Sequence, residues 1–140
     1  MDRITEGLLN EFSREFSIAD LPQADRFAQF SAWLTCRRYY SETTFDPANL
    51  VTGKGDDIGI DSIAIIVNNN LVTDVDTIED LIGVNGYLDV TFVFVQASHS
   101  PHFDSGKIGT FGHGVRDFFV EGKMPRNAVL CSKYTKQHIA

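Results

Sequence analysis

The sequence predicts an α/β domain in which a mixed β-sheet is flanked by helices. Three observations support this prediction: apolar residues at helical spacing near the N-terminus, two β-branched segments in the middle of the chain, and a phenylalanine-rich amphipathic segment after them. The chain has 140 residues, of which 43% are hydrophobic, and these values are typical of one globular domain. We therefore expect residues 1–140 to form a single domain with its own core.

Two helices are expected before the sheet. Apolar residues recur at helical spacing over residues 4–16 and predict the first helix. Asp20 is expected to cap the second helix, with Pro22 in its first turn, and the helix is expected to end near Tyr40. Residues 41–55 follow and are predicted to be a loop.

The middle of the chain has strand-like patterns. Residues 58–67 are rich in β-branched side chains and predict a strand, and the asparagines at 68–70 predict a turn into a short returning strand at 71–73. Residues 77–82 predict a short helix. Residues 88–96, with the sequence LDVTFVFVQ, are apolar on both faces, which predicts the central strand of the sheet.

A third long helix and a last strand are predicted towards the C-terminus. Ser105 is expected to cap the helix, and apolar residues from Ile108 to Phe119 share one of its faces. Gly109, Gly112 and Gly114 each weaken the helix by up to about 1 kcal/mol, which suggests close packing or a bend. Residues 128–134 predict a final strand, reached by a crossover that would make the sheet mixed, with helices on both faces.

The charge balance limits how this chain could bind nucleic acid. The net charge is −7 and the isoelectric point is near 4.9, whereas broad binding to nucleic acid depends on Lys and Arg neutralising phosphates. A local basic groove remains compatible with this composition. No apolar run reaches the roughly 20 residues that cross a membrane, and the first six residues lack the features of a signal peptide, so we expect a cytoplasmic protein without a membrane partner.

Two groups of polar residues interrupt the predicted strands. Asp61 ends the segment GDDIGID and lies among isoleucines, where a buried carboxylate without a partner is costly. It is either a strand-end residue that caps or faces water, or a metal ligand at an open sheet edge. Gln96 and Ser98 share one face of the later strand. If the two strands are neighbours, Asp61 and Gln96 meet near one end of the sheet.

These motifs carry a resemblance to a known family. GDDIGIDSIAIIVN, followed by LDVTFVFVQAS and FDSGKIGTFGHGVRDFF, resembles the N-terminal domain of the abortive infection phage resistance (AIPR) family over about residues 27–119. The resemblance implies a restriction-endonuclease-like PD-(D/E)xK core at the front of a longer phage-defence protein. It also implies a hydrolase activity, the metal-dependent cleavage of phosphodiester bonds in DNA or RNA.

The resemblance assigns roles to individual residues. Asp61 corresponds to the metal-binding aspartate, Gln96 to a second ligand through its side-chain oxygen, and the backbone carbonyl of Ala97 to a third. Such oxygen-only sites suit Mg²⁺ or Mn²⁺. The catalytic lysine of the motif, which would assist the attacking water or the charged transition state, corresponds to Ser98.

Two positions depart from the family pattern. Ser98 cannot supply a positive charge, and the FAQF segment that contains Ala28 and Gln29 lacks the glutamate that often supports the metal in such folds. Either the domain has become a non-catalytic module that binds nucleic acid or protein, or an introduced change removed the lysine, or another lysine substitutes. Lys107 is the nearest candidate, and its alternative interpretation is an ordinary exposed lysine. A further alternative is an interaction domain that forms a homodimer.

Other chemistries have weaker support in the sequence. Cys36 and Cys131 are far apart and lack a CxxC spacing, so neither a zinc site nor a redox motif is expected. His99 and His102 lie three residues apart without a third ligand at regular spacing, and His113 is expected to face solvent. No phosphate-binding P-loop motif and no Gly-x-Ser-x-Gly motif is present.

Overall fold

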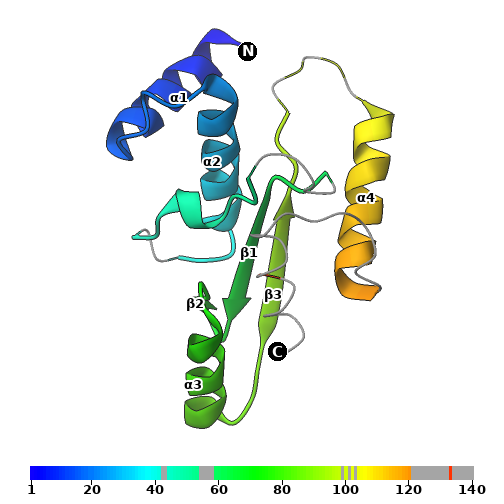
Figure 1. The fold of residues 1–140 in the computed structure, drawn as a ribbon. Helices are drawn as coiled ribbons and strands as arrows, with labels where there is room; N and C mark the ends of the chain where they lie inside the picture. The colour runs from blue at the N-terminus through cyan, green and yellow to red at the C-terminus, as the bar shows by residue number, and fades with distance from the viewer. Residues whose placement is uncertain are drawn as a thin grey trace.

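The computed structural model describes residues 1–41, 44–53, 59–98, 100, 102, 104–120 and 133. This part of the chain has an α/β architecture of four α-helices and one three-stranded sheet (Figure 1). The elements are α1 (Arg3–Glu15), α2 (Gln23–Cys36), the 3₁₀-helix η1 (Pro47–Asn49), β1 (Ser62–Val67), β2 (Asn70–Leu71), α3 (Val75–Asn85), β3 (Val90–Val95) and α4 (Ser105–Val120). The predicted α/β class is therefore confirmed.

The sheet has the strand order β2-β1-β3, and its described strands pair only in antiparallel fashion. The segment that would make the sheet mixed, residues 128–134, lies outside the described residues except for Lys133, whose backbone is helical. The prediction of a strand is therefore wrong at Lys133.

β1, and not the LDVTFVFVQ segment, is the central strand among the described residues. All six residues of β1 are buried, whereas Thr91 of β3 is exposed. Ile63 and Ile65 of β1 face one side of the sheet, and Ala64 and Ile66 face the other. Because both segments are apolar on both faces, their sequence patterns could not decide which of them is central.

Helices cover both faces of this sheet, as expected (Figure 1). On one face, Ile78 of α3 and Phe118 of α4 pack against the isoleucines of β1. On the other face, Ala32 and Cys36 of α2 pack against Ala64 and its neighbours. α1 lies further out and packs on α2 through a cluster of aromatic rings and one leucine, namely Leu9, Phe12, Phe16, Phe27, Phe30 and Trp33.

The starts of two helices differ from the sequence predictions. α2 begins at Gln23 with Pro22 as its N-cap and without a side-chain cap, because the backbone of Pro22 itself turns the chain into the helix and its carbonyl accepts from the amides of Asp25 and Arg26. The predicted capping role of Asp20 is therefore wrong. Similarly, α4 is capped by Asp104, whose carboxylate accepts from two backbone amides of the first turn, and not by Ser105.

The turn after β1 and the two ends of α3 follow the expected turn and capping chemistry more closely than the starts of α2 and α4 do. Asn68 and Asn69 both have positive φ angles, of 50° and 65°, and form the tight turn between β1 and β2. α3 is longer than the predicted 77–82, because Asp74 caps its start with a 2.9 Å bond to the amide of Thr77 and Gly86 ends it with a φ of 70°.

Glycines control how closely α4 approaches the sheet. Gly59, just before β1, has a φ of 74°, and a Cβ atom there would lie 3.2 Å from the backbone nitrogen of Phe111 in α4. Within α4, Gly114 is buried, in line with the expected close packing. Gly109 and Gly112 have open space in the described part of the chain, so close packing does not explain them.

Candidate functional site

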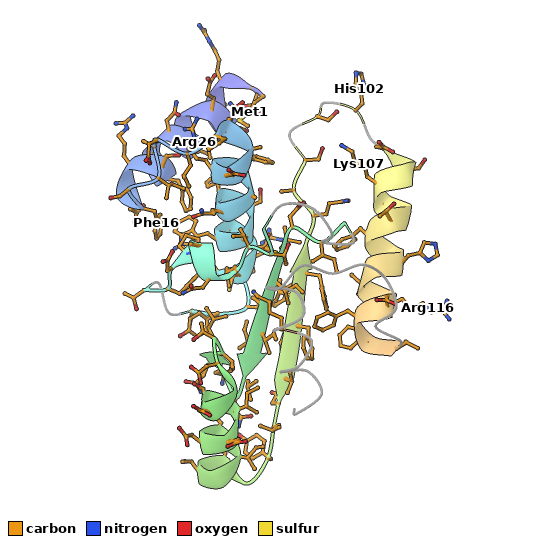
Figure 2. The ribbon with its side chains drawn as sticks, in the orientation of Figure 1. Met1, Phe16, Arg26, His102, Lys107 and Arg116 are labelled. Carbon is orange, nitrogen blue, oxygen red and sulfur yellow. The ribbon has the colours of Figure 1, made fainter. Side chains whose placement is uncertain are left out.

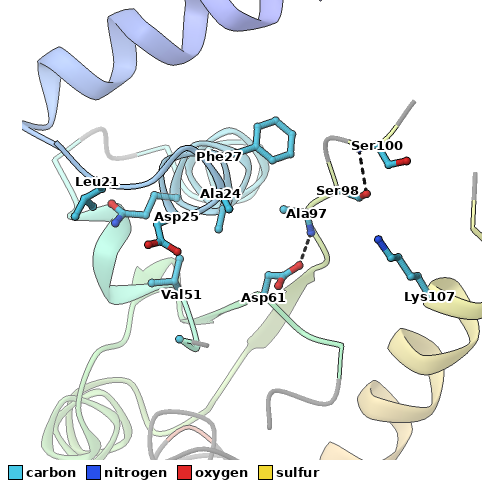
Figure 3. A pocket seen from close by; sticks show the side chains of 13 residues that line it. Leu21, Ala24, Asp25, Phe27, Val51, Asp61, Ala97, Ser98, Ser100 and Lys107 are labelled. Carbon is cyan, nitrogen blue, oxygen red and sulfur yellow. Dashed lines mark hydrogen bonds between the residues drawn. The ribbon is translucent and has the colours of Figure 1, made fainter. Parts of the chain in front are cut away.

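The start of β1 and the end of β3 meet beside a pocket of about 620 Å³. One wall is the N-terminal half of α2, and the other carries Asp61, Ala97, Ser98 and Lys107 (Figure 3). This volume lies within the range of ligand-binding pockets, about 300–1,000 Å³. The pocket therefore has the size for a small molecule or for part of a polymer.

Asp61 enters this pocket from an irregular end of β1. Its amide donates a 2.9 Å hydrogen bond to the carbonyl of Val95, although Val95 is already the register partner of Ser62. Its carbonyl accepts from the amide of Thr52 at 2.9 Å on the other side. Asp61 and Ser62 thus both lie opposite Val95. This is the arrangement of a β-bulge, which commonly redirects a side chain near a functional site.

The carboxylate of Asp61 joins the two strand ends directly. Its Oδ2 atom accepts a 2.6 Å hydrogen bond from the backbone amide of Ala97, 36 residues away in sequence (Figure 3). Such a bond to an ionised carboxylate is short and stronger than a neutral one. The two motifs that the sequence singled out therefore lie together, with Asp61 beside Ala97.

Gln96 lies on a neighbouring hollow and does not line the Asp61 pocket. That hollow, of about 330 Å³, is also lined by Ser98, His102 and Lys107. Ser98 and Lys107 thus line both depressions, and Gln96 and Asp61 line one each. Ser98 is exposed, and its Oγ accepts from the amide of Ser100 at 3.4 Å.

Lys107 lies in the first turn of α4, where its side chain reaches towards the pocket. Its amino group points to the segment that carries Ser98, whereas Arg116 on the same helix points away from it (Figures 2 and 3). Lys107 is exposed, so its charge acts at the rim of the pocket. The candidate lysine named from the sequence thus lines the same two depressions as Ser98.

Asp25 and Gln29 also line the pocket, although no role was predicted for them from the sequence. Asp25 lies one turn before Ala28 and Gln29 and adds a carboxylate to the α2 side of the pocket. Gln29 is only 7% exposed, and its Oε1 atom has no hydrogen-bond partner among the described residues. The spacing of Asp25 from the FAQF segment is the signal that could have identified it.

The side chains around the pocket offer oxygen ligands rather than soft ones. Among the described residues, no three His, Cys, Asp or Glu side chains lie close enough together to hold a metal ion. Mg²⁺, however, is commonly held by one or two carboxylates with water and substrate phosphates. The carboxylate of Asp61 fits that requirement, whereas the carboxylate of Asp25 lies apart from it (Figure 3), and the pocket does not fit a zinc site.

The other residues considered from the sequence lie away from this pocket or outside the described chain. Cys36 is a buried free thiol, and burial raises the pKa of this thiol to about 11 while the charge of Lys133 opposes the shift. His113 is exposed, as expected. The segment 54–58, His99 and Cys131 lie outside the described residues.

Comparisons with protein-family models, with curated proteins and with solved structures found no match to this chain. In the described part of the chain, no helix has both the length and the apolar character needed to cross a membrane.

Proposed function

We propose that this chain is a nuclease-like domain of an abortive-infection, phage-defence protein, and that the Asp61 pocket binds a phosphodiester of DNA or RNA together with Mg²⁺ or Mn²⁺. The observation that carries the proposal is that Asp61, Ser98 and Lys107 line one pocket at the joined ends of β1 and β3. A central β1 with helices on both faces is compatible with the restriction-endonuclease-like core that the sequence motifs suggest.

The proposal gives each residue of the pocket a chemical role. Asp61 would hold the cation, which when bound would polarise the scissile phosphate and lower the pKa of a water molecule. Lys107 would place a positive charge near the phosphate, where charge develops during hydrolysis. Ser98 offers only a hydroxyl group at the position of the motif lysine.

Two observations favour weak hydrolysis or binding without hydrolysis. Lys107 is exposed and comes from α4 rather than from position 98 after β3, so its charge is not at the position that the motif assigns to the lysine. Gln96 lines the neighbouring hollow, which leaves the expected second ligand away from Asp61. A non-catalytic binding module on the same fold is the second candidate, favoured by the serine at position 98.

Calorimetric titration of Mg²⁺ and Mn²⁺ tests the cation site. We expect the wild type to bind either ion, Asp61→Asn to lose binding, and Asp89→Asn to keep it. Asp89 is a matched control because it is exposed and adjoins the opposite end of β3. If the wild type binds neither ion, or if Asp61→Asn and Asp89→Asn behave alike, the cation role of Asp61 is wrong and the non-catalytic alternative gains support.

A further inference from the structure

The two walls of the Asp61 pocket differ in chemistry. The α2 side presents the apolar side chains of Leu21, Ala24 and Phe27, and the opposite side presents carboxylate, hydroxyl and ammonium groups. In Figure 3, the ring of Phe27 projects from α2 on the side of the segment that carries Ala97 and Ser98. A ligand that fills this space must have one apolar, flat or compact part and one anionic part.

Gln29 adds a polar group on the apolar wall. Its side chain is 93% buried, being 7% exposed, and its carbonyl oxygen has no hydrogen-bond partner in the described part of the chain. An unsatisfied buried acceptor destabilises a fold, so its presence here indicates a role for a ligand. The terminal torsion of glutamine is soft, and a rotation of the amide can present the oxygen to a donor in the pocket.

We propose that the pocket takes one unpaired nucleotide of a single-stranded nucleic acid. The base lies against Phe27 and Leu21 with an exocyclic amino group donating to Gln29, and the phosphate lies beside Lys107 and Ser98. This inference rests on the proposed function only in that the pocket binds a phosphodiester. It adds the class of substrate, single strands rather than duplexes, and a preference for bases that carry an amino group.

Charge and shape both favour a single strand. A duplex is bound mainly through many phosphates, but the chain has a net charge of −7, and Lys107 is the one cationic side chain among the residues described at the pocket. Stacking of a base on an aromatic ring supplies affinity that does not depend on charge. A base can enter a pocket of this kind only when it is out of the helical stack.

The inference is tested by fluorescence anisotropy with a labelled oligonucleotide as a single strand and as the duplex of the same sequence, once with Mg²⁺ and once with EDTA. We expect the single strand to bind at least about tenfold more tightly than the duplex. Replacing Phe27 by Leu keeps an apolar side chain but removes the aromatic face, and we expect it to weaken binding by about tenfold. Lys107→Gln is expected to weaken binding and to lower the salt dependence by about one phosphate contact.

Two controls separate the site from its surroundings. Arg116→Gln removes a cation from the same helix away from the pocket and is expected to leave binding unchanged. Oligo-dA is expected to bind the wild type several-fold more tightly than oligo-dT does. The two oligonucleotides are expected to bind Gln29→Leu with equal affinity. This variant should fold at least as stably as the wild type, because it removes an unsatisfied acceptor.

The outcomes distinguish this inference from the proposed function. A duplex that binds as tightly as the single strand in both buffers, or Phe27→Leu and Lys107→Gln variants that bind like Arg116→Gln, would overturn the single-strand assignment and leave phosphodiester binding standing. If neither form of nucleic acid binds in either buffer, both proposals are wrong.

Discussion

Replacement of Asp61 tests whether this carboxylate holds the two strand ends together. Its Oδ2 atom accepts the Ala97 amide at 2.6 Å in a partly buried position. Hydrogen bonds to charged groups contribute about 1.5–3 kcal/mol, and Asp61→Ala also leaves the Ala97 amide without this acceptor. We therefore expect Asp61→Ala to lower the free energy of unfolding by about 2 kcal/mol. Asp61→Asn keeps a side-chain carbonyl that can accept the same bond, so we expect a loss of about 1 kcal/mol or less.

Urea denaturation followed by circular dichroism measures these differences as shifts in midpoint at constant slope. Asp89→Ala is the control, because substitution of an exposed residue usually changes stability by less than about 0.5 kcal/mol. If Asp61→Ala shifts the midpoint no more than Asp89→Ala does, the Asp61–Ala97 bond does not stabilise the strand ends, and the site geometry described above is wrong.

Three further substitutions test the packing around the site. The buried amino group of Lys133 donates to the carbonyls of Asn49, Leu50 and Ile63 at 3.1, 3.2 and 2.6 Å, so Lys133→Met should lower the unfolding free energy by about 2–3 kcal/mol; an unchanged denaturation midpoint would contradict this. Burial raises the pKa of the Cys36 thiol from 9.0 to about 11, so the thiol loses its proton at a lower pH in the unfolded chain than in the folded one. The free energy of unfolding should therefore fall as the pH rises from 9 to 11, by roughly 3 kcal/mol at most. The free energy of unfolding of a Cys36→Ala variant should fall less over the same pH range. If wild type and variant lose stability in parallel as the pH rises, the raised pKa of Cys36 is refuted. Gly59→Ala should lower the free energy of unfolding by about 2 kcal/mol, because φ is 74° at this position and the new Cβ would lie 3.2 Å from the α4 backbone. Thermal unfolding that matches the wild type would show that α4 can move away at little cost.

Local chemistry explains which elements the sequence could predict. The asparagines at 68 and 69 adopt the left-handed turn that their side chains tolerate. Leu9 and Phe12 of α1 pack on α2 as the apolar periodicity predicts, but Ile4 and Leu8 of the same pattern are exposed. The end of α3 could not be predicted in the same way. Ile82 and Val84 are exposed, so no buried apolar stripe marks the last turn of this helix. The cap of α4 lies one residue before the predicted position, because Asp104 and Ser105 are both suitable cap residues. The cap predicted for α2 is absent, because this helix begins without a side-chain cap.

The site was predictable only on the condition that the two strand-like segments are neighbours. Asp61 and the segment around Ala97 come together because β1 and β3 pair in register, which meets that condition. The position of Asp25 and Gln29 depends instead on how α2 packs across the sheet, which is a tertiary property. Asp61 and Gln96 line different depressions, and strand periodicity alone does not reveal the bulge at Asp61.

Cleavage assays on Ser98→Lys and on the double variant Ser98→Lys/Asp61→Asn test whether the Asp61 pocket is a nuclease-type site lacking one charge. Single-stranded DNA, RNA and plasmid substrates should be incubated with each protein in the presence of Mg²⁺ or Mn²⁺. We expect metal-dependent cleavage by Ser98→Lys above the wild-type level and none by the double variant. A folded Ser98→Lys protein that cleaves none of these substrates, or equal cleavage by the two variants, would contradict this assignment.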